Sequence, residues 1–370
     1  MTNRPLLTHL ASTLPSSVPF VGPEAQERQR GRPFRARIGA NENGFGASPS
    51  VAAAMAAAAP DMWKYCDPES HELRGLIARH HGIAPQNVMI GEGIDGLLGL
   101  VVRLFVEPGQ PVVTSLGAYP TFNYHVAGFG GRLITVPYRD DREDIHALAD
   151  AVRRENAPVV YLANPDNPMA SFWEGSEVQA FIEALPETTL VVLDEAYCEM
   201  APASALPRLD VARPNVLRMR TFSKVYGLAG MRCGYAIGEA ESIRAFDKVR
   251  NHFGLSRMAQ VAAEAAIKDQ DWLKEVIGRI ERARRRISDI ATQNGLRPLP
   301  SAANFVAIDC GRDGDFAMKV MQGLIARDVF VRKPMAPVIG RCIRVSCGPD
   351  HELDIFAEAL PAALAEAAGK

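Results

Sequence analysis

The stretch Thr221-Phe222-Ser223-Lys224-Val225-Tyr226-Gly227-Leu228-Ala229-Gly230-Met231-Arg232 is the most informative part of the chain. Lys224 has a serine hydroxyl directly before it and a guanidinium eight residues later. The glycines between them allow the backbone to turn tightly. A lysine that forms a Schiff base needs a fixed position and a neighbour that anchors its cofactor, and an arginine fork binds phosphate well. A lone Ser-Lys pair would indicate only a surface lysine, so further motifs in the chain are needed to identify a cofactor site.

Short apolar runs alternate with helix-length stretches on the N-terminal side of this motif and just beyond it. Strands covered on both faces are expected to read as continuous apolar runs. The alternation therefore predicts an α/β domain with a mainly parallel central sheet. The expected strands are Val88–Ile90, Val112–Thr114, Leu133–Val136, Val159–Leu162, Leu190–Leu193, Val216–Met219 and Cys233–Ile237, with helices such as Ile94–Val106 and Glu177–Leu185.

The pattern changes after about residue 240. Asp271–Gln293 has the period of a long amphipathic helix, and the strand and helix signals that follow it predict a smaller α+β domain. We expect an N-terminal arm over residues 1–45 with one short helix, packed with the small domain. A large cofactor-binding domain should then cover residues 46–240, and the small domain residues 241–370.

Composition restricts the class of protein. The chain has 370 residues, 47% of them hydrophobic and 23% charged, as in ordinary globular proteins. Its net charge of −2 gives no basic excess that would favour nucleic acid or an anionic membrane as a partner. Six cysteines without a Cys-x-x-Cys pair indicate reduced thiols in a cytoplasmic protein. No cluster of His or Cys has the spacing of metal ligands, so we expect no metal.

Two groups upstream of Lys224 follow predicted strands and suit a phosphorylated, flat cofactor. Gly91-Glu92-Gly93-Ile94-Asp95-Gly96 leads from a strand into a helix, where backbone N–H groups and the helix dipole favour an anion. Tyr119 and Phe122 lie in an aromatic-rich segment after another strand, and either ring could stack on a heteroaromatic ring. We favour Phe122 and keep Tyr119 as the alternative.

Two further groups follow the next strands. Asn167, in an Asn- and Pro-rich turn, could donate to a phenolic oxygen. Asp194 ends a fully apolar strand, a costly place for an acid without a partner. At the carboxyl edge of the sheet it could keep a pyridine nitrogen protonated, and Tyr197 could donate to the ring oxygen. Together with Lys224 these groups predict a site for pyridoxal 5′-phosphate (PLP).

The motifs resemble those of the fold-type I PLP-dependent aminotransferases, in particular the histidinol-phosphate and aromatic aminotransferase-like subfamily. The resemblance extends from Asn41-Glu42-Asn43 to Arg344, and Thr221–Arg232 is its most specific part. It implies a PLP-dependent transferase fold and transfer of an amino group from an L-amino acid or a histidinol-phosphate-like amine to a 2-oxo acid, by a ping-pong mechanism. The catalytic residues that it implies are Lys224, Asp194 and Tyr197. It also implies cofactor contacts from Gly93, Ile94, Phe122, Asn167, Asp194, Tyr197, Ser223, Lys224 and Arg232, and from Tyr65 of a neighbouring subunit, and hence a homodimer with shared active sites.

Substrate identity stays open at this stage. The resemblance assigns Arg344 to the substrate carboxylate and Arg332 to a substrate phosphate, with Asn43 nearby in the first motif. Glu92 replaces the usual asparagine of the cup, and a carboxylate there would disfavour a phosphorylated substrate. A PLP-dependent decarboxylase resembling threonine-phosphate decarboxylase shares these motifs and is the alternative reaction. A non-catalytic PLP-binding regulator would be expected to lack Lys224 or Arg344.

Overall fold

The computed structural model describes residues 5–16 and 21–369. Its strands are β1 (Ala36–Arg37), β2 (Val88–Gly91), β3 (Pro111–Ser115), β4 (Arg132–Val136), β5 (Val159–Ala163), β6 (Leu190–Asp194), β7 (Val216–Thr221), β8 (Gly234–Ile237), β9 (Arg297–Pro298), β10 (Phe305–Asp309), β11 (Val329–Phe330) and β12 (Cys342–Ser346). Its α-helices are α1 (His9–Thr13), α2 (Pro23–Arg30), α3 (Pro49–Ala58), α4 (His71–His81), α5 (Gly93–Phe105), α6 (Pro120–Gly128), α7 (Ile145–Glu155), α8 (Gly175–Ala184), α9 (Ala240–Ala245), α10 (Arg257–Lys268), α11 (Gln270–Gln293), α12 (Gly314–Ala326) and α13 (Asp350–Ala367).

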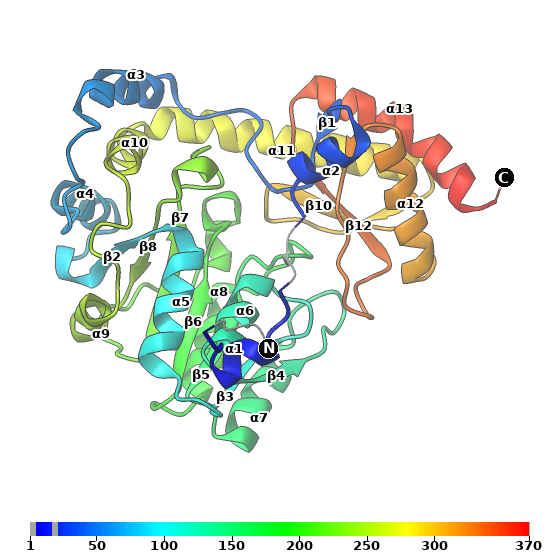
Figure 1. Cartoon of the computed structure of the whole chain (residues 1–370). Coiled ribbons are helices and arrows are strands. Elements are labelled where there is room, and N and C mark those ends of the chain that lie inside the picture. Colours follow the sequence, from blue (N-terminus) through cyan, green and yellow to red (C-terminus); the bar gives the residue numbers. More distant parts are fainter. Residues whose placement is uncertain (1–4, 17–20, 370) are drawn as a thin grey trace.

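The central sheet has seven strands in the order β2-β8-β7-β6-β5-β3-β4 (Figure 1). All of its pairs are parallel except those that β8 makes with β2 and β7. Every predicted strand of this sheet is present, which confirms the α/β class with a mainly parallel sheet. The apolar runs are continuous because both faces are covered: Val159 and Tyr161 of β5 belong to one core cluster, and Val160 and Leu162 to another.

The second cluster lies between the sheet and helices α7 and α8, which supply Leu148, Val152, Val178 and Phe181 among others. The larger cluster lies on the other face of the sheet and includes residues of α5, such as Leu97, Leu98 and Val101. Because helices cover both faces of the sheet, the expected place for a ligand-binding site is the end of the sheet where the carboxyl ends of the parallel strands meet.

A second, antiparallel sheet of order β12-β10-β9 forms with α12 and α13 the expected smaller α+β unit. The long helix α11 extends from α10 and α3 to α13 (Figure 1). Since α9 packs on β2 and α10 packs on α3 and α4, we propose that the boundary between the units lies within α11 rather than at residue 240.

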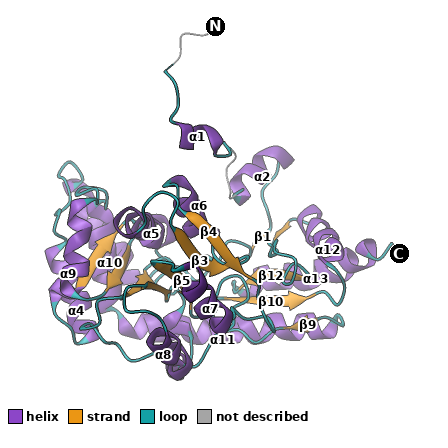
Figure 2. Ribbon diagram, turned by 90° about the horizontal axis from the view of Figure 1, so that it is seen from below, coloured by secondary structure: helices purple, strands orange, loops and turns teal. Residues whose placement is uncertain are grey.

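The N-terminal segment contains two helices in its described part, not the single one expected. Strand β1 pairs in parallel with β11, and Asp328 forms ion pairs with Arg30 and Arg32. These contacts support the proposal that the arm packs with the small unit. Helix α1 lies outside the sheet and its covering helices (Figure 2). None of the helices in the described ranges is long and apolar enough to cross a membrane.

Candidate active site

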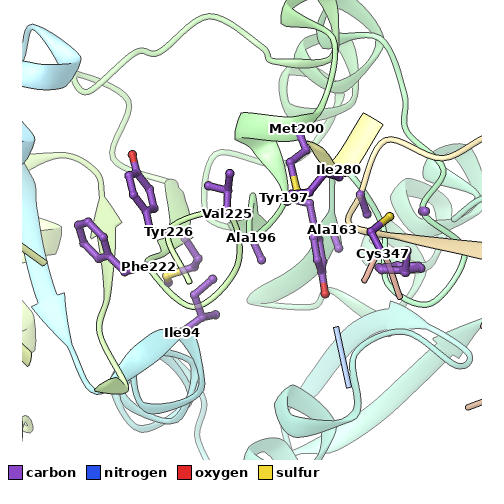
Figure 3. Packing of buried hydrophobic residues seen from close by; sticks show 14 of the residues in the cluster. Ile94, Ala163, Ala196, Tyr197, Met200, Phe222, Val225, Tyr226, Ile280 and Cys347 are labelled. Atoms are coloured by element: carbon purple, nitrogen blue, oxygen red, sulfur yellow. The ribbon is translucent and has the colours of Figure 1, made fainter. Parts of the chain in front are cut away.

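A cavity of about 360 Å³ opens where β5, β6 and β7 end. Its floor is also part of the hydrophobic core, since Ile94, Ala163, Ala196 and Tyr197 belong to both (Figure 3). The cavity is lined by Ala40, Glu42, Ile94, Asp95, Tyr119, Tyr161, Ala163, Pro165, Asn167, Asp194, Ala196, Tyr197, Thr221, Ser223, Lys224, Ala229, Gly230 and Arg232. This mixture of apolar and polar side chains is typical of a small-molecule site.

Lys224 follows β7 and its ε-amine lies in this cavity. The Nζ atom donates to the backbone carbonyl of Asn41 over 3.3 Å and lies 5.5 Å from the centre of the Tyr197 ring. Ser223 is buried beside it, and its N–H donates to the hydroxyl of Thr221 over 3.0 Å. The lysine amine is therefore held by a carbonyl rather than by a carboxylate. It can exchange this hydrogen bond for a covalent bond to a bound partner.

Asp194 ends β6 and is 5% exposed. Burial raises the pKa of its carboxyl to about 6, although donors from Tyr161 and Ala196 act in the opposite direction. The Tyr161 hydroxyl donates to Oδ2 over 2.6 Å, and the Ala196 N–H donates to Oδ1 over 2.9 Å. Two fixed donors thus hold a carboxylate at the cavity wall, where a cationic ring nitrogen would be a favourable partner.

The glycine-rich segment between β2 and α5 forms a cup at the start of α5. Gly93 has φ of +73°, and a Cβ atom there would lie 2.9 Å from Nη2 of Arg232. Arg232 is itself in the left-handed region, with φ of +53°, and its Nη2 lies 3.1 Å from Oδ2 of Asp95. Backbone N–H groups, a helix N-terminus and a guanidinium therefore converge, as an anion site requires.

The structure separates the two aromatic candidates. Tyr119, the N-cap residue of α6, lines the cavity and donates to Asp95 over 2.7 Å. Phe122, one helical turn further, is fully buried and stacks on Tyr161, with ring centres 4.8 Å apart. Phe122 therefore supports the wall from behind, contrary to our expectation, and Tyr119 is the ring in position to face a bound cofactor.

Arg344 on β12 reaches the cavity through Asn167. Its Nη1 donates to Oδ1 of Asn167 over 2.5 Å and its Nη2 to the carbonyl of Gly39 over 3.3 Å. Burial lowers the pKa of Arg344 to about 10, and its buried Nε has no hydrogen-bond partner. A buried cation with an unused donor fits an anionic substrate.

Two predicted substrate residues do not line the cavity. Glu92 is exposed at the N-cap of α5, and its Oε1 would lie 1.4 Å from a Cβ atom built on Gly254, so its carboxylate points toward that loop. The positive φ of Gly93 turns the chain between Glu92 and Ile94, which places only Ile94 at the cavity. Asn43 uses its amide to donate to the Val225 carbonyl over 2.8 Å, and so braces the segment after Lys224.

Two others lie near the site or on the surface. Arg332 forms a backbone bridge with Arg344, and its Nη2 donates to the carbonyl of Val21 over 3.0 Å. Burial lowers its pKa, and Glu42 and Tyr119 are the charged or ionisable groups that act against this shift. Tyr65 is 81% exposed, packs on Phe253 and does not line the cavity that contains Lys224.

Sequence reasoning missed Asn41, Glu42, Tyr161 and Asp95. Glu42 and Asp95 line the cavity, and Tyr161 and Asn41 hold Asp194 and Lys224. Asp95 and Asn41 lie within motifs that were noted for other residues. Tyr161 is the only polar side chain in the apolar run of β5, which is a usable signal.

Comparison with known proteins decides the family. The family model described as aminotransferase class I and II matches residues 37–360. The chain belongs to the class I and II aminotransferases. Curated relatives include the histidinol-phosphate aminotransferase of Geobacillus sp. (strain WCH70), which is 32% identical over 356 residues and is matched over 95% of this chain and 96% of its own.

Solved structures agree with this assignment. The histidinol-phosphate aminotransferase from Sinorhizobium meliloti in complex with PLP superposes with a TM-score of 0.95 at 58% identity, covering 97% of this chain and 98% of that one. Aspartate aminotransferase from Thermus thermophilus with maleate, at 20% identity, shares the fold with a TM-score of 0.82 and covers 98% and 100% of the two chains. The predictions of an aminotransferase and of its fold are confirmed.

The residues of this aminotransferase fit PLP, the cofactor of its family. The cup provides donors for a phosphate, and the space at Gly93 exists only because that residue has no Cβ. Asp194 and Lys224 both line the cavity, and a carboxylate and an amine are chemically suited to the ring nitrogen and the aldehyde of this cofactor. The cofactor is PLP.

Proposed function

We propose that this aminotransferase moves an amino group from histidinol phosphate to 2-oxoglutarate, by a ping-pong mechanism, in a homodimer with shared active sites. The observation that carries the proposal is the 58% identity, over 97% of the chain, to a histidinol-phosphate aminotransferase. Several curated relatives at more than 30% identity have the same name. These comparisons do not favour the alternative of a decarboxylase.

Each part of the cofactor has residues that we propose bind it. The N–H groups of Gly93 and Ile94, with Ser223 and Arg232, would hold the phosphate. Asp194 would face the ring nitrogen and Tyr119 would stack on the ring. Asn167 and Tyr197, which both line the cavity, would donate to the ring oxygen. Lys224 would hold the cofactor covalently.

When bound, PLP supplies a ring that withdraws electrons and so makes the Cα proton of an amino donor acidic. Asp194 would keep that ring protonated by pairing with its nitrogen. The Lys224 amine would take the proton from Cα of the amino donor on its Nζ and would pass the same proton on to the cofactor. The Asn41 carbonyl, 3.3 Å from Nζ, holds the freed amine within the cavity during this transfer.

Arg344 meets an anion in both half-reactions of the proposed cycle. Its buried, unpartnered Nε and its forked Nη atoms suit the α-carboxylate of glutamate or the phosphate of histidinol phosphate. Arg332, bridged to Arg344 through the backbone, would add a second cation for the phosphate. The Glu92 carboxylate points toward Gly254 and does not line the cavity, which supports a phosphorylated substrate.

The homodimer is proposed from exposed aromatic residues. Trp63 is 80% exposed, Tyr65 81% and Phe253 52%. Large apolar side chains gathered at a surface favour an interface. Tyr65 would reach the phosphate in the second subunit, which fits its position outside the cavity that contains Lys224 in its own chain. All six cysteines are buried and unpaired, which supports the proposed cytoplasmic location.

The proposal is tested by supplying histidinol phosphate and 2-oxoglutarate to the PLP-loaded protein and measuring glutamate. We expect turnover, parallel lines in double-reciprocal plots at varied substrate concentrations, and no release of carbon dioxide. A matched pair of variants locates the phosphate contact: Arg332→Gln should raise the KM for histidinol phosphate about tenfold or more through loss of a charged contact, and Glu92→Gln should leave it unchanged.

If the protein transfers the amino group of other donors but not that of histidinol phosphate, the proposed substrate is wrong and the aminotransferase activity still holds. Carbon dioxide release without glutamate would reject the reaction itself.

A further inference from the structure

Asn41 is a buried residue next to the site, and the proposed function uses its backbone carbonyl but leaves its side chain without a role. It is 2% exposed and lies between Ala40 and Glu42, which both line the cavity. Its φ is +56°, a region in which asparagine is among the few tolerated residues other than glycine. Position and conformation are therefore both constrained.

The hydrogen bonds of the Asn41 side chain join it to Ser346 and to Tyr197. The Ser346 hydroxyl accepts from the backbone N–H of Asn41 over 3.0 Å and donates to Oδ1 of Asn41 over 3.0 Å. The oxygen end of the amide therefore faces Ser346 on β12. Its nitrogen end donates to the hydroxyl oxygen of Tyr197 over 3.1 Å.

This direction matters for Tyr197. An amide N–H can only donate, so the Tyr197 oxygen is the acceptor and its own hydrogen stays available. Tyr197 lines the cavity, and its ring is fixed edge-on against Phe305, with centres 5.5 Å apart. With the ring fixed and one lone pair occupied, the remaining hydrogen can be donated into the cavity.

The backbone carbonyl of Asn41 acts on the second proposed catalytic group. It accepts from Nζ of Lys224 over 3.3 Å and from Nδ2 of Asn304 over 3.0 Å. Asn304 precedes β10 and Ser346 ends β12, so the small sheet holds Asn41 from two sides. One residue thus fixes groups that lie 156 and 183 positions away in the sequence.

We propose that Asn41 is a positioning residue that directs the Tyr197 hydroxyl hydrogen toward the ring oxygen of the cofactor and holds the Lys224 amine in place. The inference rests on the roles of Tyr197 and Lys224 in the proposed function. Removing the amide should free the tyrosine hydrogen to turn elsewhere. Replacing it by a carboxylate should attract that hydrogen away from the cavity, because a carboxylate only accepts.

Two variants separate this role from a structural one. Asn41→Gly keeps the positive φ without strain and deletes the side chain. Asn41→Asp keeps the shape and reverses the direction of the bond to Tyr197. The PLP-loaded variants are compared by the pH midpoint of the cofactor's visible absorbance, by kcat with whichever amino donor the wild type accepts, and by thermal unfolding.

We expect Asn41→Gly to lower kcat about threefold to tenfold, the effect of one lost hydrogen bond, and to move the absorbance midpoint by about 0.5 to 1 pH unit. Asn41→Asp, although isosteric, should have the larger effect. The changes in kcat and in the absorbance midpoint should largely disappear when the Asn41 substitutions are made in a Tyr197→Phe background, because Asn41 is proposed to act through the Tyr197 hydroxyl and the two substitutions are then not additive. Ser346→Ala, which leaves Asn41 in place, should show a smaller shift in the same direction.

An unchanged midpoint in Asn41→Gly and Ser346→Ala would overturn the proposal, as would a full effect of Asn41→Gly on the Tyr197→Phe background. Should Asn41→Asp fail to fold, the Asn41→Gly and Ser346→Ala comparisons still decide. The absorbance titration needs no histidinol phosphate, so rejection of that substrate would leave this test intact.

Discussion

Tyr161→Phe tests whether the buried hydroxyl controls the charge of Asp194. The substitution removes one oxygen and leaves the ring, which stacks on Phe122, in place. The lost bond joins a hydroxyl to a buried carboxylate over 2.6 Å. Hydrogen bonds to charged groups contribute about 1.5–3 kcal/mol, and 1.36 kcal/mol corresponds to about one pKa unit.

The pKa of Asp194, about 6 in the wild type, should therefore rise by one to two units, from the ~1.4 kcal/mol per unit just given. At pH 7 the ionised fraction would fall from about 90% to between about 50% and 10%. Since only the ionised carboxyl pairs with a protonated ring nitrogen, the affinity for PLP at pH 7 should fall about twofold to tenfold.

The sign of the pH dependence follows from linkage. The pKa of this carboxyl is raised in the folded protein, so its ionisation lowers stability by the full amount above the folded pKa of about 6, and this cost is lost progressively as the pH falls from there to the pKa of the unfolded chain. The loss of stability in the variant should be larger at pH 8.5 than at pH 5 by about 1.4–2.7 kcal/mol, because at pH 5 the folded wild type and the folded variant both carry Asp194 in its neutral form.

Urea unfolding of the cofactor-free protein at the two pH values measures this difference. Tyr235→Phe is the matched control, because the Tyr235 hydroxyl is also buried and its partner at 3.0 Å is His81. Burial lowers the pKa of His81 to about 3, so it is neutral at both pH values and the control's loss should not depend on pH. An equal loss for Tyr161→Phe at pH 5 and 8.5 would refute our account of Asp194.

Three further predictions concern the cofactor and the substrate. Lys224→Ala should abolish turnover and the absorbance of the bound cofactor while the thermal unfolding temperature stays close to that of the wild type. Turnover at the wild-type rate in this variant would exclude the lysine mechanism. Arg344→Lys should raise the KM for 2-oxoglutarate about 100-fold with a smaller change in kcat, since one ammonium cannot replace a fork that also contacts Asn167; an unchanged KM in steady-state kinetics would move the carboxylate contact elsewhere. Gly93→Ala should weaken PLP binding at least about tenfold, because a β-carbon would clash with Arg232 and strain a positive φ; equilibrium titration with PLP gives the answer, and wild-type affinity would place the phosphate outside the cup.

The fold could be predicted from the sequence because each central strand is an uninterrupted apolar run. The same runs located Asp194 and Lys224, since polar residues that directly follow buried parallel strands meet at one edge of the sheet. These inferences use only the local sequence and one rule of sheet topology. They do not depend on which helices pack against each other.

The errors have local and non-local causes. Whether Glu92 faces the cavity depends on the φ of Gly93, and the choice between Tyr119 and Phe122 depends on one turn of α6. Neither is encoded in residue type. The role that we propose for Asn41 could not be predicted from the sequence, because its partner Ser346 lies 305 positions away. Our proposal to move the domain boundary from residue 240 into α11 depends on a similarly distant contact, the packing of α10 on α3.

The bond between Asn41 and Ser346 also sets an order of events during synthesis. The strands that carry the cup, Asp194 and Lys224 all lie between residues 88 and 237, so a growing chain can pair them before the last third emerges from the ribosome. The contacts of Asn41 and Arg344 have to wait for β12, and closing such long loops is slow. We therefore expect nascent chains halted before residue 342 to form the central sheet while the groove for the amino donor is still unfinished.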